Sequence, residues 1–497
     1  MFIKEILLGF FIIFIVRLVW KWKRFFYLAS KIPKSQFDFS WQGVKDAFNA
    51  DNRMIFKMIY ESFDGVNGLA KTWLGPMLFV IISSPEDVKI VMNSKECLDK
   101  PYFIRFPGPV LKGTLFGDIE FWHKHRKILD PYFGVQKLKR FIDLFDEKSK
   151  VLTKNVAKML DQGDFDIFHY MTALTLETIL NAMEFEIDIQ NQESKVRDLT
   201  IEGLEIATKL VTQRIFRFYL HPEFIYRQTK MYVTETKAKA HSAFSYTDDV
   251  INNIRIKLKK NHDEVEEDKP TTFMRALVSS KFNLDESEIR DEVKTLLIAA
   301  QDTTAISMSA TLLLLAMHKD KQAKVIDEMH RVIGNNPDIP FTDFDKLNEL
   351  HYLEMVINEA LRLMPVVPFV FRSVDSEITS HEGYIIPPNA NLIIPIFKIQ
   401  RNKTFWGEDA NKFRPERFEK ENIKKVNSYA FLPFTKGPRI CLGWRYAMML
   451  MKIQLCNFLM RYEVDTSLKY EELEFELNVT LNICQGFKIS IKERKER

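Results

Sequence analysis

The sequence predicts a large globular fold that is crossed by at least one long helix. The chain has 497 residues, of which 46% are hydrophobic and 28% charged, and its 41 phenylalanines indicate a large apolar interior. Asp285 and Glu288 have the spacing of a helix N-cap and its reciprocal partner, and they open a pattern that runs to about Met317 without proline or glycine. Such a helix would measure about 48 Å, which is enough to cross a domain. No linker divides the chain after its N-terminal segment.

The first twenty residues predict a membrane anchor. Residues 6–16 form an unbroken apolar run, which residues 18–20 extend past Arg17. A run this short could also be a signal-peptide core, but no small-x-small cleavage pattern follows it, which favours retention. Lys21, Lys23 and Arg24 follow the run, and this basic excess predicts that the rest of the chain lies in the cytosol. We therefore expect an anchor at residues 1–20, a basic linker at 21–34 and a folded domain at 35–497.

Charge and cysteine content exclude several classes of function. The net charge of +4 is too mild to indicate nucleic acid as a partner. The four cysteines, at positions 97, 441, 456 and 484, form no CxxC pair, which favours reduced thiols and leaves a single disulfide open. None of the ten histidines has a zinc-like spacing such as HExxH. A cysteine thiolate is therefore the one well-formed metal ligand that the sequence indicates.

Three polar patterns precede the C-terminal region. Trp122-His-Lys-His-Arg126 places an indole and a guanidinium about one helical turn apart, although an ordinary amphipathic basic helix has the same pattern. Ala299-Ala-Gln-Asp302-Thr303-Thr304 lies within the long predicted helix between two apolar runs. One explanation is structural: Thr303 could bond back to a carbonyl one turn earlier while Asp302 meets a buried cation.

The third pattern is Glu359-Ala-Leu-Arg362, whose ends share one helix face. An isolated surface pair of this kind contributes only about 0–1 kcal/mol. Phe413-Arg-Pro-Glu-Arg417 follows about fifty residues later and offers a second arginine.

The most informative segment is Phe434-Thr-Lys-Gly437-Pro-Arg439-Ile-Cys441-Leu-Gly443. Gly437 can adopt a backbone conformation closed to other residues, Gly443 leaves room for a flat group, and Phe434 could shield the sulfur from water. If residues 442–455 are helical, as their apolar spacing suggests, Cys441 lies at a helix N-terminus, which favours its thiolate form. The alternative is a buried structural cysteine beside a glycine turn.

Taken together, these motifs resemble the haem-thiolate monooxygenases, the cytochromes P-450, whose signature is FxxGxRxCxG. The resemblance covers nearly the whole chain and implies a mainly α fold with small β-sheets, in which residues 35–497 form the haem-thiolate catalytic domain. It implies that Cys441 is the metal ligand of haem b, a ligation chemistry that defines the family. The resemblance implies four further residues as partners of the haem propionates: Trp122, Arg126, Arg372 and Arg439. It also implies Phe434 and Gly443 as cofactor-binding residues.

The resemblance also assigns chemistry and structure to the earlier motifs. The family pattern [AG]Gx[DE]T[TS] gives proton delivery during oxygen activation to Asp302 and Thr303, and this chain departs from it by having Ala300 in place of glycine. The family joins Glu359, Arg362 and Arg417 in a buried network that supports the fold. Residues 292–304 resemble the corresponding segment of the fourth P-450 family and its insect relatives. Because Ala299 replaces a glutamate that some members esterify to haem, we expect haem that acid solvent can extract.

The implied activity is monooxygenation: one oxygen atom from O2 enters a lipophilic substrate such as a fatty acid, a hormone-like lipid or a xenobiotic. The implied partners are the membrane, NADPH-cytochrome P-450 reductase as the route for electrons from NADPH, and cytochrome b5 as an optional second donor. The implied location is the endoplasmic reticulum membrane with the catalytic domain in the cytosol. A basic docking face for the electron donor is expected from Lys124, Lys127, Lys436 and Arg445.

Two rival functions stay open at this level, a haem-thiolate isomerase that needs neither oxygen nor reductase and a membrane-anchored haem store or sensor. The acid and hydroxyl at positions 302 and 303 argue against both. By resemblance, the substrate contacts lie in residues 102–116, 200–224, 296–304, 366–371 and 478–482, which are mostly apolar.

Overall fold

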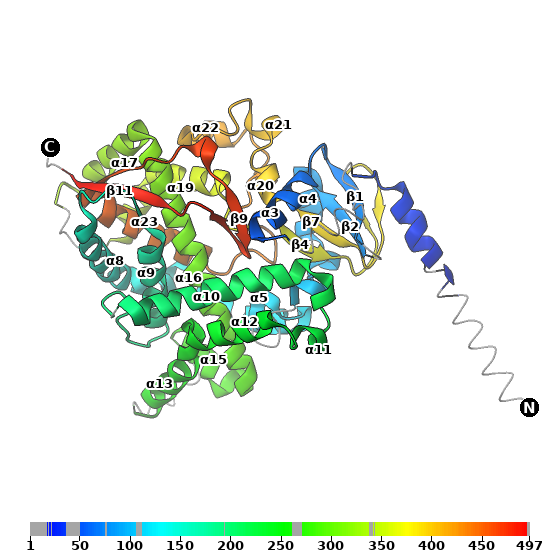
Figure 1. Ribbon diagram of the computed structural model, residues 1–497, viewed down its shortest axis with the longest axis horizontal. Helices are drawn as coiled ribbons and strands as arrows, with labels where there is room; N and C mark the ends of the chain where they lie inside the picture. Colours follow the sequence, from blue (N-terminus) through cyan, green and yellow to red (C-terminus); the bar gives the residue numbers. More distant parts are fainter. Residues whose placement is uncertain are drawn as a thin grey trace, which may run out of the picture.

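Helices make up most of the chain, and the strands are short (Figure 1). The computed structural model describes residues 17, 19–20, 22–35, 50–74, 77–105, 112–192, 194–260, 271–336, 341 and 343–494. Within these ranges the strands form four small sheets. The mainly helical fold with small β-sheets is therefore confirmed.

The helices are numbered in chain order, and several of the short ones act as connectors. They are α3 (Asn52–Glu61), α4 (Pro85–Asn93), α5 (Gly113–Phe116), α6 (Ile119–Leu129), α7 (Val135–Leu138), α8 (Ile142–Val156), α9 (Phe168–Ala182), α10 (Ser194–Phe216), α11 (Glu223–Tyr226), α12 (Lys230–His241), α13 (Thr247–Lys260), α15 (Phe273–Val278), α16 (Glu286–Met317), α17 (Lys319–Val332), α18 (Phe344–Glu349), α19 (His351–Leu363), α20 (Ile396–Ile399), α21 (Lys403–Trp406), α22 (Lys420–Ile423) and α23 (Trp444–Arg461).

The long predicted helix is α16, which begins and ends within a residue of the expected bounds. Its N-terminal capping box is present: the Glu288 N–H donates to Asp285 Oδ1 (2.8 Å), and the Asp285 N–H donates to Glu288 Oε2 (3.0 Å). In the described part of the chain α16 is the one helix long and apolar enough to span a membrane. Because 78% of its most apolar stretch is buried inside the protein, α16 is the central helix of the domain.

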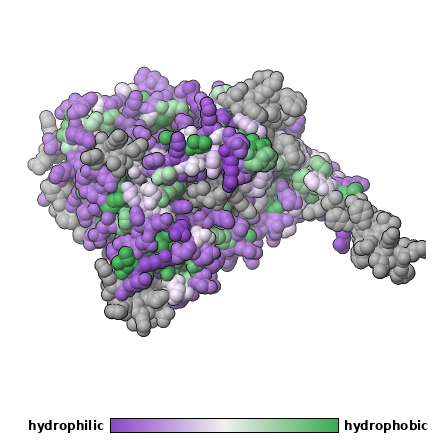
Figure 2. Space-filling model, turned by 60° about the horizontal axis from the view of Figure 1, so that its bottom comes forward, coloured by the Kyte–Doolittle hydropathy of each residue, from purple (hydrophilic) through white to green (hydrophobic). Residues whose placement is uncertain are grey.

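The two largest of the five hydrophobic clusters among the described residues lie in different parts of the molecule. The larger one surrounds α16, which packs against α9, α19 and α23, while α8 packs against α9 and α23. The smaller one lies under the four-stranded sheet, at the opposite end of the molecule in Figure 1. Figure 2 shows a face on which hydrophilic side chains predominate and hydrophobic ones form small patches, as expected where a domain meets water.

The sheets differ in pairing. The largest has the order β1-β2-β7-β4, with β2 and β7 parallel and the other pairs antiparallel. A hairpin of β9 and β10 approaches α16, and its turn residue Val479 has a φ of 68°. The strands are β1 (Leu69–Leu74), β2 (Met77–Ile82), β3 (Phe165–Asp166), β4 (Val370–Ser373), β5 (Ile378–Thr379), β6 (Ile385–Ile386), β7 (Asn391–Ile394), β8 (Tyr462–Asp465), β9 (Phe475–Asn478), β10 (Thr480–Ile483) and β11 (Lys488–Glu493).

The N-terminal segment that we expected as a basic linker is partly helical and packs on the domain. Residues 22–31 are helical, and the ring of Phe26 stacks between Trp22 and Trp73 of β1 at 5.8 Å from each. Arg24 donates two hydrogen bonds to Glu377 (2.5 and 2.7 Å). Most of the predicted anchor at residues 1–20 lies outside the described residues, so the division into anchor, linker and domain stays a prediction.

Candidate active site

Cys441 lies in a closed loop shortly before α23. Its backbone N–H donates a hydrogen bond to the carbonyl of Phe434 (3.0 Å), and the Ile440 N–H donates to the carbonyl of Gly437 (3.0 Å). Thr435 and Gly437 have φ angles of 59° and 74°, which allow the chain to reverse within the loop. These contacts hold the cysteine in a fixed position relative to the helix that follows.

The two glycines of this loop meet different surroundings. A Cβ at Gly437 would lie 2.1 Å from the carbonyl oxygen of Met92 in α4, so a larger residue cannot keep this packing. A Cβ at Gly443 would meet nothing within 4 Å. The open space at Gly443 agrees with the expectation that a flat group approaches the chain there.

The thiol of Cys441 is surrounded by protein and yet accessible, which means that it lines an internal void. Burial raises the pKa of the thiol, although a hydrogen bond from the Gly443 backbone and the charge of Arg126 act in the opposite direction. The expectation that a helix N-terminus favours the thiolate form of Cys441 stays a prediction, because α23 begins at Trp444 and its N-cap is Gly443, so that Cys441 lies just before the helix. A bound metal cation supplies the charge that stabilises a thiolate in such a place.

One turn in the middle of α16 has accessible side chains, although the helix runs through the larger core. Ala299 is exposed and Ala300 and Thr303 are half-buried, although the flanking turns of the helix are buried. Ala300 packs against the same core as Phe434 and Leu442 of the cysteine loop. The accessible turn of α16 therefore carries small side chains.

Trp122, Arg126 and Arg439 come together where α6 meets the cysteine loop. The guanidinium of Arg439 lies 4.0 Å from the ring centroid of Trp122 and donates to the carbonyl of Leu98 (2.9 Å). Arg126 Nη1 donates to the carbonyl of Ile440 (2.7 Å), and its Nε pairs with Asp130 (2.6 Å). Because part of the Arg126 charge is neutralised by Asp130, Arg126 is the weakest anion partner of the set.

Arg372 of β4 is a buried cation. It is 4% exposed, and its Nη1 donates to the carbonyl of Phe371 (2.8 Å). Among the described residues no carboxylate lies within ion-pair distance of it. Burial lowers the pKa of Arg372 to about 10, with Cys97 acting weakly in the opposite direction. A buried guanidinium with this surplus of charge is suited to an anionic group of a bound molecule.

Asp302 and Thr303 point to different partners. The Thr303 hydroxyl donates to the carbonyl of Ala299 one turn earlier (2.6 Å), as the structural explanation expected. Among the described residues Asp302 has no cation as a partner; instead it accepts a hydrogen bond from the hydroxyl of Thr480 in β10 (2.6 Å). Burial raises the pKa of Asp302 to about 6, the Thr480 hydrogen bond opposes this shift, and the nearby charge of Glu205 adds to it. This carboxyl group can therefore exchange a proton near neutral pH.

The structure brings Glu359, Arg362 and Arg417 into one buried network. Arg362 makes two parallel hydrogen bonds to Glu359 (2.7 and 2.8 Å), and both side chains are 0% exposed. Arg417 Nε lies 3.4 Å from the same carboxylate, and its Nη1 donates to the carbonyl of Trp406 (2.7 Å). Arg362 also donates to the carbonyls of two residues far along the chain, which ties α19 to the segment before α22.

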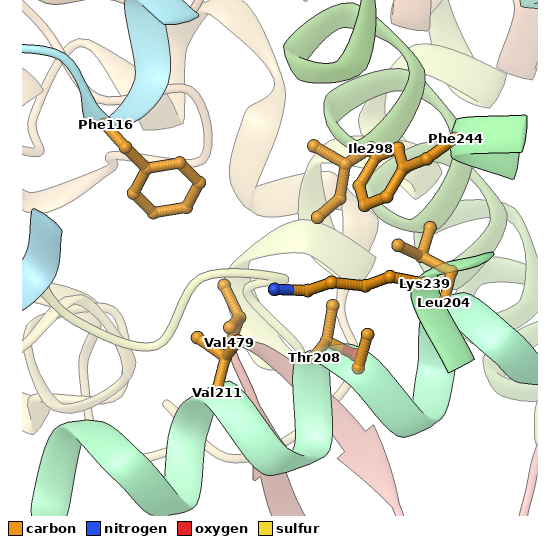
Figure 3. Close-up of a pocket in the computed structure, with 9 residues that line it drawn as sticks. Phe116, Leu204, Thr208, Val211, Lys239, Phe244, Ile298 and Val479 are labelled. Carbon is orange, nitrogen blue, oxygen red and sulfur yellow. The ribbon is translucent and has the colours of Figure 1, made fainter. Parts of the chain in front are cut away.

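An apolar void lies beside α16, between α10 and the hairpin of β9 and β10 (Figure 3). Its lining comes from four of the five segments expected to contact substrate; the exception is residues 366–371. The lining residues are Phe116, Leu204, Ala207, Thr208, Val211, Lys239, Phe244, Ile298 and Val479. Figure 3 shows the Lys239 side chain extending among the apolar groups, and Lys239 forms an ion pair with Glu235.

Several residues at this site were missed by sequence reasoning. Lys239 and Phe244 line the void from outside the expected segments. Thr480 lies within residues 478–482, but nothing in the sequence indicates that its hydroxyl reaches Asp302. His125 was read only as part of the 122–126 pattern, and it is completely buried against α16. The i, i+3 spacing of Trp122 and His125 is the only signal that could have indicated a shared face.

Comparison with known proteins agrees with this geometry. Residues 45–490 match the family model described as Cytochrome P450. Cytochrome P450 4d1 of Drosophila melanogaster is 31% identical over 416 residues, which cover 80% of this chain and 79% of that protein. Probable cytochrome P450 313b1 of the same species is 29% identical over 430 residues, covering 83% and 84%. Probable cytochrome P450 313a2, also of that species, is 27% identical over 510 residues, covering 99% and 100%.

The family model spans nearly the whole folded chain, including α16, the buried arginine network and the cysteine loop. The fold, the enclosed cysteine and the match to the family model lead to one identification: the chain belongs to the cytochrome P450 family and is a monooxygenase of that family.

Proposed function

We propose that this cytochrome P450 binds haem b through the thiolate of Cys441 and inserts one oxygen atom from O2 into a lipophilic substrate. Electrons come from NADPH through NADPH-cytochrome P-450 reductase, with cytochrome b5 as an optional second donor. The observation that carries this proposal is the surroundings of Cys441: an enclosed but accessible thiol beside the open space at Gly443.

The residues of the site fit haem. A cysteine thiolate is the iron ligand that the family uses, which Cys441 would supply, and the space at Gly443 would leave room for a flat macrocycle. The propionates need cations in a medium of low dielectric, and the buried charge of Arg372 meets that need. Trp122, Arg126 and Arg439 form a second group of donors on α6 and the cysteine loop. When bound, the haem supplies the oxygen-activating chemistry, and its thiolate ligand favours O–O bond cleavage.

The other residues of the site bind, shield and exchange protons. Phe434, which packs against the larger core, is assigned the role of keeping water away from the sulfur. Asp302 holds a proton for part of the time near neutral pH, while its Oδ2 accepts the hydrogen bond from the Thr480 hydroxyl. Thr303 lies one position further along the accessible turn of α16, where its hydroxyl can pass a proton on.

The void beside α16 supports a lipophilic substrate. All but two of its lining side chains are apolar, and the single charged one, Lys239, is already paired with Glu235. Binding there is driven mainly by removal of apolar surface from water, and a difference-spectrum screen of lipophilic ligands would identify the preferred class.

The first test is spectroscopic. The reduced, carbon monoxide-saturated protein should show a Soret maximum shifted far to the red, and a Cys441→Ser variant should lack that shift. Acid solvent should extract the haem, because Ala299 offers no carboxylate for an ester bond. A wild-type protein without the shifted band, or with haem retained by the polypeptide after extraction, contradicts the corresponding part of the proposal.

The second test separates the three functions that the sequence left open. With reductase present, a monooxygenase consumes substrate only when both NADPH and O2 are supplied. An isomerase would convert a peroxide without either, and a haem store or sensor would consume nothing. Because Asp302 and Thr303 occupy an accessible turn of a buried helix, we expect the first outcome.

We also propose that the protein is anchored in the endoplasmic reticulum membrane with its catalytic domain in the cytosol. The glycosylation sequon at Asn402 tests this topology, because Asn402 is only half-buried and a luminal domain would carry a glycan there. The second sequon, at Asn478, is uninformative because that side chain is 1% exposed. An unmodified Asn402 in a eukaryotic membrane preparation is the expected result.

A further inference from the structure

A histidine lies fully buried between two carboxylates where α6 meets α16. His125 Nε2 is 3.3 Å from Glu288 Oε1, and His125 Nδ1 is 3.1 Å from Glu292 Oε1. The side chains of His125 and Glu292 are both 0% exposed. The imidazole also stacks on Phe121, with 3.9 Å between the ring centroids. Removing this many polar groups from water is costly, and among the described residues His125 Nδ1 and Glu292 Oε1 have no hydrogen-bond partner, so their contact with each other is what offsets that cost.

The outer carboxylate of the cluster has two further partners. Glu288 completes the capping box of α16 with Asp285, and it accepts hydrogen bonds from Lys124 (2.7 and 2.9 Å). The same side chain therefore fixes the beginning of α16 and holds α6 against it.

The inner carboxylate connects to the residues that we assign to the haem propionates. Glu292 accepts a hydrogen bond from the hydroxyl of Thr114 in α5 (3.2 Å). The carbonyl of Thr114 in turn lies 3.5 Å from Arg439 Nη1, and Arg439 stacks on Trp122. A single residue, Thr114, therefore bridges Glu292 and Arg439.

His125 is also linked to the residues that we assign to the haem propionates, through its neighbour Arg126. It is the neighbour of Arg126 on α6, and Arg126 binds the carbonyl of Ile440, directly before Cys441. A contact made by His125 on α16 therefore sets where α6 places Arg126 relative to the cysteine loop. These contacts connect α16 through α6 to the loop of Cys441.

We propose that His125 is a positioning residue for the haem, which acts through Glu288 and Glu292 to hold Trp122, Arg126 and Arg439 in place for the propionates. This inference rests on the proposed ligation of haem by Cys441. It assigns to His125 a role in haem retention and in the integrity of the thiolate bond, without contact to the haem itself.

Three substitutions separate polar positioning from simple packing. His125→Asn keeps a donor near the position of Nδ1, His125→Gln keeps one near the position of Nε2, and His125→Phe keeps the ring and its stacking but neither donor. His123→Gln on the same helix is the matched control, because His123 is exposed. Two quantities are measured on the purified holoenzyme: the rate of haem transfer to excess apomyoglobin, and the fraction of the reduced carbon monoxide complex that has the red-shifted Soret band.

We expect His125→Phe to release haem at least about tenfold faster than the wild type and to lose much of the shifted band, which corresponds to about 1.4 kcal/mol or more. The rates of haem release from His125→Asn and His125→Gln should lie between those of His125→Phe and the wild type. His123→Gln should release haem at the wild-type rate. If His125→Phe retains haem as well as the wild type and His125→Asn is the worst variant, packing alone matters and the inference is wrong.

A second variant protects the test against misfolding. Glu292→Gln keeps the shape of the buried side chain and removes its charge, so it should fold and still release haem faster than the wild type. Wild-type release by Glu292→Gln overturns the inference while leaving the proposed function intact. Absence of the shifted band from the wild-type protein would instead overturn the proposed function, and this inference with it.

Discussion

Two carboxylates inside the protein, one on α19 and one on α16, have very different partners. Glu359 of α19 accepts two hydrogen bonds from Arg362 and one from the Arg414 backbone (2.8 Å), and Arg417 lies 3.4 Å away. Asp302 of α16 accepts one hydrogen bond, from the Thr480 hydroxyl, in the part of the chain that the structure describes. Both side chains are inside the protein, so burial alone does not distinguish them.

The difference indicates a division of tasks. Two guanidinium groups stabilise the charge of Glu359, so its network is suited to holding the fold around the cysteine loop. A neutral hydroxyl stabilises the charge of Asp302 only weakly, and burial raises the pKa of Asp302 to about 6. A buried acid with a single neutral partner is suited to exchanging protons, which is the role that we propose for Asp302.

The largest effect is expected from breaking the fully paired network. Arg362→Ala leaves the carboxylate of Glu359 buried beside one remaining arginine, at a cost of about 3–5 kcal/mol. Because the network ties α19 to the chain before the cysteine loop, we expect the variant to contain no haem when purified. The measurement is the haem-to-protein ratio from absorbance.

The matched control for this variant is Arg414→Ala. Arg414 contacts Glu359 only through its backbone N–H, and its half-exposed side chain pairs with Asp409 at the surface. Its haem content should stay normal. A normal haem content in Arg362→Ala would contradict the assignment of this network to the fold.

The next largest effect is the pH dependence of stability that Asp302 produces. The pKa of Asp302 is about 6 in the folded protein and about 3.9 in the unfolded chain, so the folded state holds a proton that the unfolded state has lost between these values. The contribution of this group to stability is therefore full below about pH 4, falls as the pH rises to about 6, and is constant above. The total loss is roughly 3 kcal/mol.

Asp302→Asn isolates this contribution, because the amide does not titrate. The difference in melting temperature between the variant and the wild type should grow from pH 5 to pH 7, in favour of the variant. Thr480→Val should shift the wild-type transition to higher pH, since the lost hydrogen bond stabilises the charged form, whereas Thr480→Ser should restore it. Parallel curves for wild type and Asp302→Asn would show that Asp302 has the same pKa in both states.

The two carboxylates also show what a sequence can and cannot predict. Glu359, Arg362 and Arg417 could be placed together because the spacing of charges on one helix and the match to a family motif are properties of the sequence. The partner of Asp302 could not, because Thr480 is far away in the chain and only the tertiary position of the β9–β10 hairpin brings its hydroxyl to α16. The expected partner was a cation, and the observed one is neutral.

In the cysteine loop, too, only some features could be predicted from the sequence. Its glycine turn could be predicted from residue types, and Gly437 does adopt a positive φ. The start of the following helix was expected two residues too early, at 442, because Leu442 and Gly443 form a turn and α23 begins at Trp444. The pKa of Cys441 could not be predicted either, because burial by residues from distant parts of the chain raises it.

A smaller effect, on the rate of reduction by the electron donor, is expected from substitutions in the proposed basic docking face. Of the four residues expected in a basic docking face, Lys124 is held by Glu288, whereas Lys436 and Arg445 lie over aromatic rings and have no carboxylate within 4 Å among the described residues. We propose that Lys436 and Arg445 contribute most to docking of an acidic electron donor. Charge reversal at either should slow reduction by the reductase roughly threefold at low salt.

The control for this prediction is Lys124→Gln, which should have less effect on the rate of reduction because Lys124 is already neutralised. Stopped-flow reduction at several ionic strengths is the measurement. A rate that is independent of salt in the wild type would rule out a docking face built from charge.

The smallest effect is expected at Ala300, two residues from Asp302 on the same accessible turn of α16. Its methyl group lies where many members of the family have glycine, and we expect it to narrow the groove that admits oxygen and water. Ala300→Gly removes this obstruction and costs at most about 1 kcal/mol of helix stability. Because Asp302 and Thr303 are unchanged, activity should persist while the ratio of product to hydrogen peroxide shifts modestly. An unchanged ratio would show that proton delivery here depends on the partners of Asp302 and not on the width of the groove.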